Sequence, residues 1–206
     1  MTITSAMSYT TIFILSIISL SATTGLSASV NKSKQMKRDP IVTTSKKDDI
    51  YFVHAEMDVN FTPSEFLTLV NASDEDCSWI ANCRKVNILS KQNNVQIIHT
   101  KLSVNWPFKD RDMVVLTVYS LNEESLSITL SDQSTYTDFN KDYVRITDVT
   151  GEWKMIKNGP EYYSLSYRGA ASPNGVIPDW FAVNYLADST KKTFLALNKR
   201  LEKTSE

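Results

Sequence analysis

The sequence has few of the residues that build metal, phosphate and cofactor sites. Its 206 residues include two histidines, two cysteines and five glycines. A His-rich metal site cannot be built from His54 and His99, and Cys77 and Cys83 lack the spacing of zinc ligands. Five glycines are too few for a phosphate-binding cradle, and the chain contains no G-x-S-x-G or dinucleotide-binding motif. The sequence therefore predicts no metal and no cofactor. Each histidine is flanked by strand-type residues, which favours a hydrogen-bonded core or rim role over a catalytic base.

An excess of positive charge is also missing. The formal net charge is −1, whereas nucleic-acid binding needs a basic face that displaces counterions from phosphates. We therefore expect no nucleic-acid partner.

The first 31 residues contain no Asp, Glu, Lys or Arg. They include the apolar run TIFILSIISL at 11–20, followed by the small residues Ser27, Ala28 and Ser29. An apolar core of about 7–15 residues before a small-residue site is typical of a secretory signal peptide, although Lys and Arg are missing ahead of the run. The run is short for a membrane span, which needs about 20 residues. We expect a signal peptide at 1–29, cleaved near Ser27 to Ser29, and a periplasmic or secreted domain at 30–206. The alternatives are a retained N-terminal anchor and a buried or disordered segment.

Export would permit a disulfide between Cys77 and Cys83. On a continuous helix their Cα atoms would be about 9 Å apart, beyond the roughly 7 Å limit for a bridge. The bond therefore requires a break near Asn82. The alternative is two free, half-buried thiols.

The N-terminal half of the domain combines strands with short helices. We expect a linker at 30–49 with a short extended piece at 41–44, then a strand at 50–60. Pro63 opens a helix in which Phe66, Leu67 and Val70 have helical spacing. A second short helix is expected from Asp74 to Ala81.

Strand follows strand from there, in segments rich in Val, Ile, Thr and Tyr. Short polar turns between successive strands indicate antiparallel pairing, because parallel pairs need long crossovers. Gly151 is expected at a bend between two of them. The expected strands are 86–89, 95–102, 113–121, 126–130, 143–149, 152–156 and 162–168.

The C-terminal segment changes to a helical period. Pro178 suits a first turn, and no Gly or Pro occurs from Asp179 to Lys203. Apolar residues between Trp180 and Leu201 recur at three- and four-residue steps along one face. About 25 residues give a helix of roughly 37 Å, long enough to cross a sheet.

Three stretches resemble the START (StAR-related lipid transfer) family of the helix-grip superfamily. They are NWPFKDRDMV at 105–114, VRITDVTGEWK at 144–154, and the segment that starts with IPDWFAVN at 177–184 and continues to Leu201. The resemblance covers about residues 40–204. It implies an α+β helix-grip fold: a curved antiparallel sheet packed on a long C-terminal helix, with two short helices after the first main strand.

The resemblance also implies an internal cavity that binds one lipid or other apolar ligand without catalysis, in a monomer, as a module for lipid binding or for lipid binding and transfer. Arg111 is the leading polar candidate for the site. Its guanidinium either contacts a ligand head group or pairs with an acidic side chain. Alternatively, it holds the loop in place by bonding backbone carbonyls or Asp112. The loop of Trp106, Pro107 and Phe108 corresponds to the mobile loop of the family. It is either a gate that touches a membrane transiently or a cap on the core. The expected ligand-binding residues are Arg111, Met113, Val115, Tyr143, Tyr163, Phe181 and Tyr185.

Two other functions remain open at this point. One is an enzyme like the cyclases and aromatases of the same superfamily, which would need acid–base groups deep in the pocket. The other is a structural or interaction domain whose core is filled by side chains.

Overall fold

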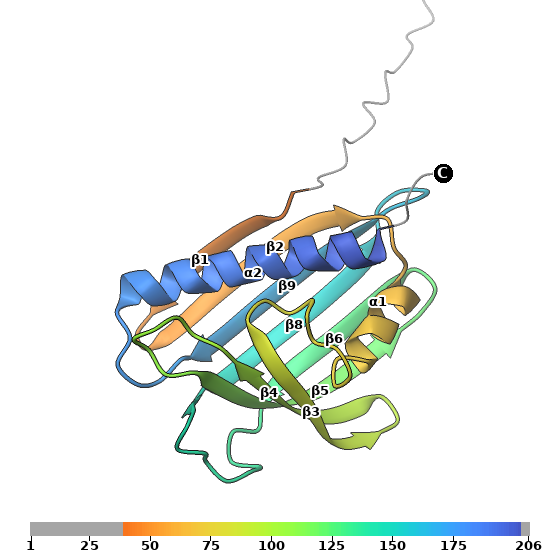
Figure 1. Ribbon diagram of the computed structural model, residues 1–206. Coiled ribbons are helices and arrows are strands. Elements are labelled where there is room, and N and C mark those ends of the chain that lie inside the picture. Colours follow the sequence, from red (N-terminus) through yellow and green to blue (C-terminus); the bar gives the residue numbers. More distant parts are fainter. Residues whose placement is uncertain (1–38, 203–206) are drawn as a thin grey trace, which may run out of the picture. The chain divides into compact units, whose positions relative to one another are not determined.

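The structure is a computed structural model, and it describes residues 39–202 (Figure 1). The expected signal peptide at 1–29, its cleavage site and the anchor alternative lie outside the described residues. No helix between residues 39 and 202 is both long enough and apolar enough to cross a membrane.

One nine-stranded sheet forms the framework, in the order β1-β2-β9-β8-β6-β5-β4-β3. Neighbours in this order are antiparallel, and β7 pairs parallel with the start of β5. The strands are β1 (Ile41–Lys47), β2 (Ile50–Val59), β3 (Cys83–Gln92), β4 (Val95–Leu102), β5 (Arg111–Leu121), β6 (Ser125–Asp132), β7 (Val144–Arg145), β8 (Thr147–Lys157) and β9 (Tyr163–Ser172).

Two helices accompany the sheet, α1 (Pro63–Asn71) and α2 (Asp179–Leu201). The first begins as predicted at Pro63, and Thr62 and Glu65 form a capping box around its start. The second lies across the sheet and contacts β1 and β2 (Figure 1). The predicted α+β class, with a long C-terminal helix on an antiparallel sheet, is therefore confirmed.

The predicted second short helix at Asp74–Ala81 is wrong, because the described residues contain one short helix after β2 and turns occupy 72–82. Local side-chain hydrogen bonds compete with helix formation here: the Asp76 carboxylate accepts from the backbone N–H of Ser78 at 2.9 Å. Asn82 has a positive φ of 61°, which ends any helix at the position where the sequence required a break.

The predicted bend at Gly151 is also wrong. Gly151 lies inside β8, and the strand expected at 143–149 is divided between β7 and the start of β8. The chain bends instead at Asp148, whose φ is 55°, and the β8–β9 register shifts between Thr147 and Thr150. Both features belong to a β-bulge, which needs no glycine when an Asp adopts the left-handed conformation.

The core lies between the sheet and the helices at the end where α2 finishes. Phe66 of α1 and Phe194 and Leu197 of α2 are fully buried there. Trp153 of β8 contacts both helices, with ring centroids 5.5 Å from Phe66 and 5.3 Å from Phe194. The opposite end of α2 borders a pocket.

Candidate ligand pocket

A pocket of about 330 Å³ lies between the concave face of the sheet and α2. Period-two alternation places residues 111, 113, 115 and 117 of β5 on its wall, while the residues between them face the other side. Arg111 is the one charged residue among the described residues that line it. The wall is mostly apolar and includes Val53, Val86, Ile98, Leu102, Met113, Val115, Ile128, Leu130, Ile146, Val149, Ala182 and Leu186.

The structure brings four of the seven predicted ligand residues to this pocket. They are Arg111, Met113 and Val115 of β5 and Tyr185 of α2. Whether they bind a ligand stays a prediction.

The other three predicted residues do not line the pocket. Tyr143 precedes the two-residue β7, and the Lys101 ammonium lies 5.2 Å from its ring centroid. Tyr163 starts β9, packs against the core, and lies beyond the part of the strand that lines the pocket. Phe181 faces aromatic neighbours, with ring centroids 4.4 Å from Phe108 and 5.8 Å from Tyr185.

The Arg111 side chain is 5% exposed and connects three backbone carbonyls. Its Nε donates to Pro173 at 3.1 Å, Nη2 to Asn174 at 3.2 Å, and Nη1 to Lys109. Burial lowers the pKa of this guanidinium from its usual value. Of the alternatives above, the tie to backbone carbonyls is the one that the structure contains. It fixes the segment between β9 and α2 against the start of β5.

Asp112 does not pair with Arg111, because adjacent strand residues face opposite sides of the sheet. It forms a two-pronged ion pair with Arg145, in which both N–O distances are 2.9 Å, and it accepts a hydrogen bond from Nε2 of His99 at 2.8 Å. Burial alone would raise the pKa of Asp112, but the hydrogen bonds of Arg145 and His99 outweigh burial and lower it. This cluster stabilises the side of the sheet away from the pocket.

The predicted gate loop exposes one aromatic residue and packs another. Trp106 is 92% exposed, whereas Phe108 rests on Phe181 at the start of α2. Two further apolar residues near this end of the helix are exposed, Val176 at 94% and Trp180 at 68%. Several apolar side chains near the start of α2 are thus exposed. The role of the loop as a gate stays a prediction.

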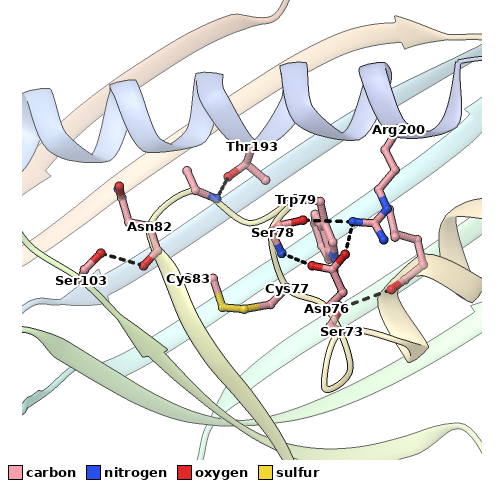
Figure 2. Close-up of a disulfide and its surroundings, with 12 residues drawn as sticks. Ser73, Asp76, Cys77, Ser78, Trp79, Asn82, Cys83, Ser103, Thr193 and Arg200 are labelled. Carbon is pink, nitrogen blue, oxygen red and sulfur yellow. Dashed lines mark hydrogen bonds and ion pairs between the residues drawn. A yellow bond between two sulfur atoms is a disulfide. The ribbon is translucent and has the colours of Figure 1, made fainter.

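The Cys77–Cys83 disulfide is present, as predicted, with the Cα atoms 6.0 Å apart (Figure 2). It closes a loop, residues 77–83, which we call the disulfide loop. Trp79, Ile80 and Ala81 of this loop line the pocket. The disulfide therefore constrains part of the pocket wall.

The disulfide loop and the residues beside it also bind α2. The backbone N–H of Ala81 donates to Thr193 at 3.0 Å, and the Asn82 amide donates to Ser189 at 3.0 Å. Figure 2 shows Arg200 reaching from α2 to Asp76, where the N–O distance is 2.7 Å. These hydrogen bonds and this ion pair hold α2 in place from its middle to its C-terminal end.

A separate polar contact holds the first residue of α2. Asp179 accepts from the Lys46 ammonium at 2.8 Å and from the Tyr51 hydroxyl at 2.7 Å. These two hydrogen bonds lower the pKa of Asp179 from its usual value.

Among the pocket residues that sequence reasoning missed are Trp153, Tyr167 and Gly169. All lie on β8 or β9. A glycine inside a strand pattern often marks a close approach of another group, so Gly151 and Gly169 were the available signal.

Comparisons with known proteins give the class of fold. No protein-family model matches the chain. An uncharacterised protein of Pseudomonas aeruginosa is 27% identical over 139 residues, which cover 65% of this chain and 69% of that protein.

Solved structures with similar folds include a StAR-related lipid transfer protein of Xanthomonas axonopodis. Its TM-score is 0.71 at 19% identity, covering 82% of this chain and 96% of the other. Human StAR-related lipid transfer protein 5 gives a TM-score of 0.67 at 15% identity, covering 82% and 84%. An aromatase/cyclase of Streptomyces gives 0.50 at 12% identity, covering 73% and 96%. The chain has a helix-grip fold. Within that class, its fold is similar to those of the StAR-related lipid transfer proteins.

Proposed function

We propose that this protein binds one lipid, or another apolar molecule of similar size, in the pocket between the sheet and α2. The observation that carries the proposal is the pocket wall itself. Burial of each ligand CH₂ group there contributes about 0.8 kcal/mol, so an acyl chain or a sterol needs no covalent attachment. The volume of about 330 Å³ lies within the range of small-molecule sites.

The composition of the wall favours binding over acid–base catalysis. The described residues that line the pocket include no Asp, Glu, His, Lys or Cys, and their ionisable groups are Arg111 and the tyrosines Tyr51, Tyr167 and Tyr185. Acid–base catalysis most often uses a His or a carboxyl group beside the reacting atoms. The volume also argues against a filled structural core.

Two measurements test lipid binding. Native mass spectrometry of the protein purified from its own host should show a co-purified apolar molecule. Delipidated protein should then take up one labelled sterol or phospholipid per chain. Failure across a broad lipid panel, with no co-purified ligand, would contradict the proposal.

We also propose that the protein is exported as a monomer to the periplasm or the cell exterior. The Cys77–Cys83 disulfide supports an oxidising compartment, because such bonds are rare in the cytosol. The intact mass of the protein from its host should correspond to a chain that begins near residue 28 to 30. A full-length mass would contradict cleavage.

A transient membrane contact at the exposed apolar end of α2 would let the ligand pass between pocket and bilayer. Trp106, Val176 and Trp180 are the side chains that support this contact.

A further inference from the structure

Two glycines face each other across the sheet beside the pocket, and one of them, Gly169, lines it. Gly151 of β8 and Gly169 of β9 pair directly in the sheet, and both lie inside their strands. Glycine weakens a strand interior because it has no side chain to pack and loses more backbone entropy on folding. A pair of them at matched positions therefore calls for a group that approaches the backbone closely.

That group is the phenol of Tyr167. A Cβ atom built on Gly169 would lie 2.6 Å from the Tyr167 hydroxyl oxygen, and one built on Gly151 would lie 3.4 Å from it. The other end of the ring packs against Trp153, with centroids 4.5 Å apart. The glycine pair and Trp153 thus hold the hydroxyl in one place on the wall of the pocket.

The hydroxyl of Tyr167 has no hydrogen-bond partner among residues 39–202, which separates it from the other two tyrosines of the pocket. Tyr51 donates to Asp179, and Tyr185 donates to the carbonyl of Ser103. Burial raises the pKa of Tyr167 to about 12, so the hydroxyl keeps its proton at neutral pH. The Tyr167 hydroxyl is therefore a neutral donor, held in position on the pocket wall, whose proton is not used by another described residue.

We propose that the Tyr167 hydroxyl donates a hydrogen bond to an uncharged oxygen of the bound ligand, an alcohol or an ester carbonyl on an otherwise apolar molecule. This inference rests on the proposed function and names the class of ligand that the site selects. Tyr167 is a specificity-determining residue in this role.

A charged head group fits this position poorly. Burying an ionised carboxylate needs a paired cation, and Arg111, the one cation among the described lining residues, already donates to three backbone carbonyls. An alcohol or carbonyl satisfies the phenol without bringing a charge into the apolar wall. The ligand should therefore be neutral where it meets Tyr167.

The test compares ligands that share one chain and differ in the head group. Delipidated protein is loaded with the neutral dye N-phenyl-1-naphthylamine, which is then displaced by dodecan-1-ol, methyl dodecanoate, dodecanoate or 1-chlorododecane. Wild type, Tyr167→Phe and Tyr163→Phe are compared after circular dichroism has verified their folding. Tyr163 lies on the same strand but outside the pocket, so its variant is the matched control.

We expect Tyr167→Phe to lower the affinity for the alcohol and for the ester by about five- to tenfold, which corresponds to the loss of one neutral hydrogen bond. The affinity for 1-chlorododecane should change by less than about twofold, because a halide is a poor acceptor. Tyr163→Phe should leave all affinities unchanged. Dodecanoate should bind wild type more weakly than dodecan-1-ol.

Other outcomes separate the two proposals. Equal affinity of wild type and Tyr167→Phe for dodecan-1-ol would overturn the role of Tyr167 while leaving lipid binding intact. An equal loss for every head group would overturn it as well, because only packing would have changed. Dodecanoate binding as tight as that of the alcohol would overturn the preference for an uncharged oxygen. Failure of wild type to bind the dye or any chain would contradict the proposed function itself.

Discussion

The two halves of α2 are held in different ways. The second half carries Phe194 and Leu197, both fully buried, and is fastened by the disulfide loop and by the Arg200–Asp76 ion pair. The first half begins with the exposed Trp180, and its first residue, Asp179, is held by two solvent-accessible polar contacts. Burial of large apolar side chains stabilises a contact far more than a surface ion pair does.

The difference predicts which end of the pocket would open to admit a ligand. Local opening follows the regions with few buried apolar contacts and exposed polar bonds. If the pocket admits a ligand, the start of α2 and the Trp106–Phe108 loop should separate while the end of α2 stays in place.

Phe194→Ala should have the largest effect. It removes a fully buried ring that packs on Trp153, and such changes cost about 3–5 kcal/mol of the free energy of unfolding. Phe181→Ala, on the half-buried first turn of the same helix, should cost less than half as much. Urea unfolding monitored by circular dichroism measures both. Equal losses would mean that the two halves are equally anchored.

Replacing both cysteines, Cys77→Ser with Cys83→Ser, should have the next largest effect. Loss of a cross-link that closes so short a loop should lower the free energy of unfolding by about 2–3 kcal/mol. It should also weaken dye binding, because residues of the disulfide loop line the pocket and bind α2. Reduction of the wild type by a dithiol, in which two electrons and two protons pass to the sulfur atoms, should reproduce both changes. A stability loss without any loss of dye binding would show that the loop does not shape the pocket.

The sequence predicted the parts of this asymmetry that depend on local pattern. The long helix, the antiparallel strands, the opening of α1 at Pro63 and the disulfide all follow from spacing and residue type. The break near Asn82 was deduced from the reach of a disulfide, yet the helix expected before it does not form. In that segment the Asp76 carboxylate accepts from the backbone N–H of Ser78. This hydrogen bond competes with those of a helix, and helix propensity alone does not account for it.

The pocket residues were harder to predict, because strand register decides which face each side chain occupies. Arg111, Met113 and Val115 were placed together correctly, since the strand through them is long and regular. Tyr143 was misplaced relative to the pocket because the expected strand is divided at Ile146, and Tyr143 precedes the short β7, which pairs with the start of β5. Tyr167 was overlooked because one of the two glycines beside its hydroxyl, Gly151, lies on the neighbouring strand β8, and that strand pairing is not local information.

Asp179→Asn should have a smaller effect that depends on pH. The pKa of Asp179 is lowered in the folded state by the hydrogen bonds of Lys46 and Tyr51. A carboxyl with a lowered pKa stabilises the fold above its unfolded pKa, and this contribution is lost as the pH falls through the folded value. The midpoint of thermal unfolding of wild type should therefore exceed that of Asp179→Asn at neutral pH. The two midpoints should converge only as the pH falls below the folded pKa of Asp179, which lies under the usual Asp value of about 3.9. A difference that persists in acid would show that packing at the start of α2, and not the charge, is responsible.

Trp180→Ala should have the smallest effect on stability and the most specific effect on function. The side chain is 68% exposed, so the free energy of unfolding should change by less than about 0.5 kcal/mol. Leu195→Ala is the matched control, because Leu195 is an exposed apolar residue on the second half of the same helix. If the first half of α2 contacts membranes, co-sedimentation with phosphatidylcholine vesicles should fall for Trp180→Ala and stay at the wild-type value for Leu195→Ala. Equal sedimentation of all three proteins would contradict a membrane contact at the start of α2. The asymmetry of α2 would then describe only how the pocket opens to solvent.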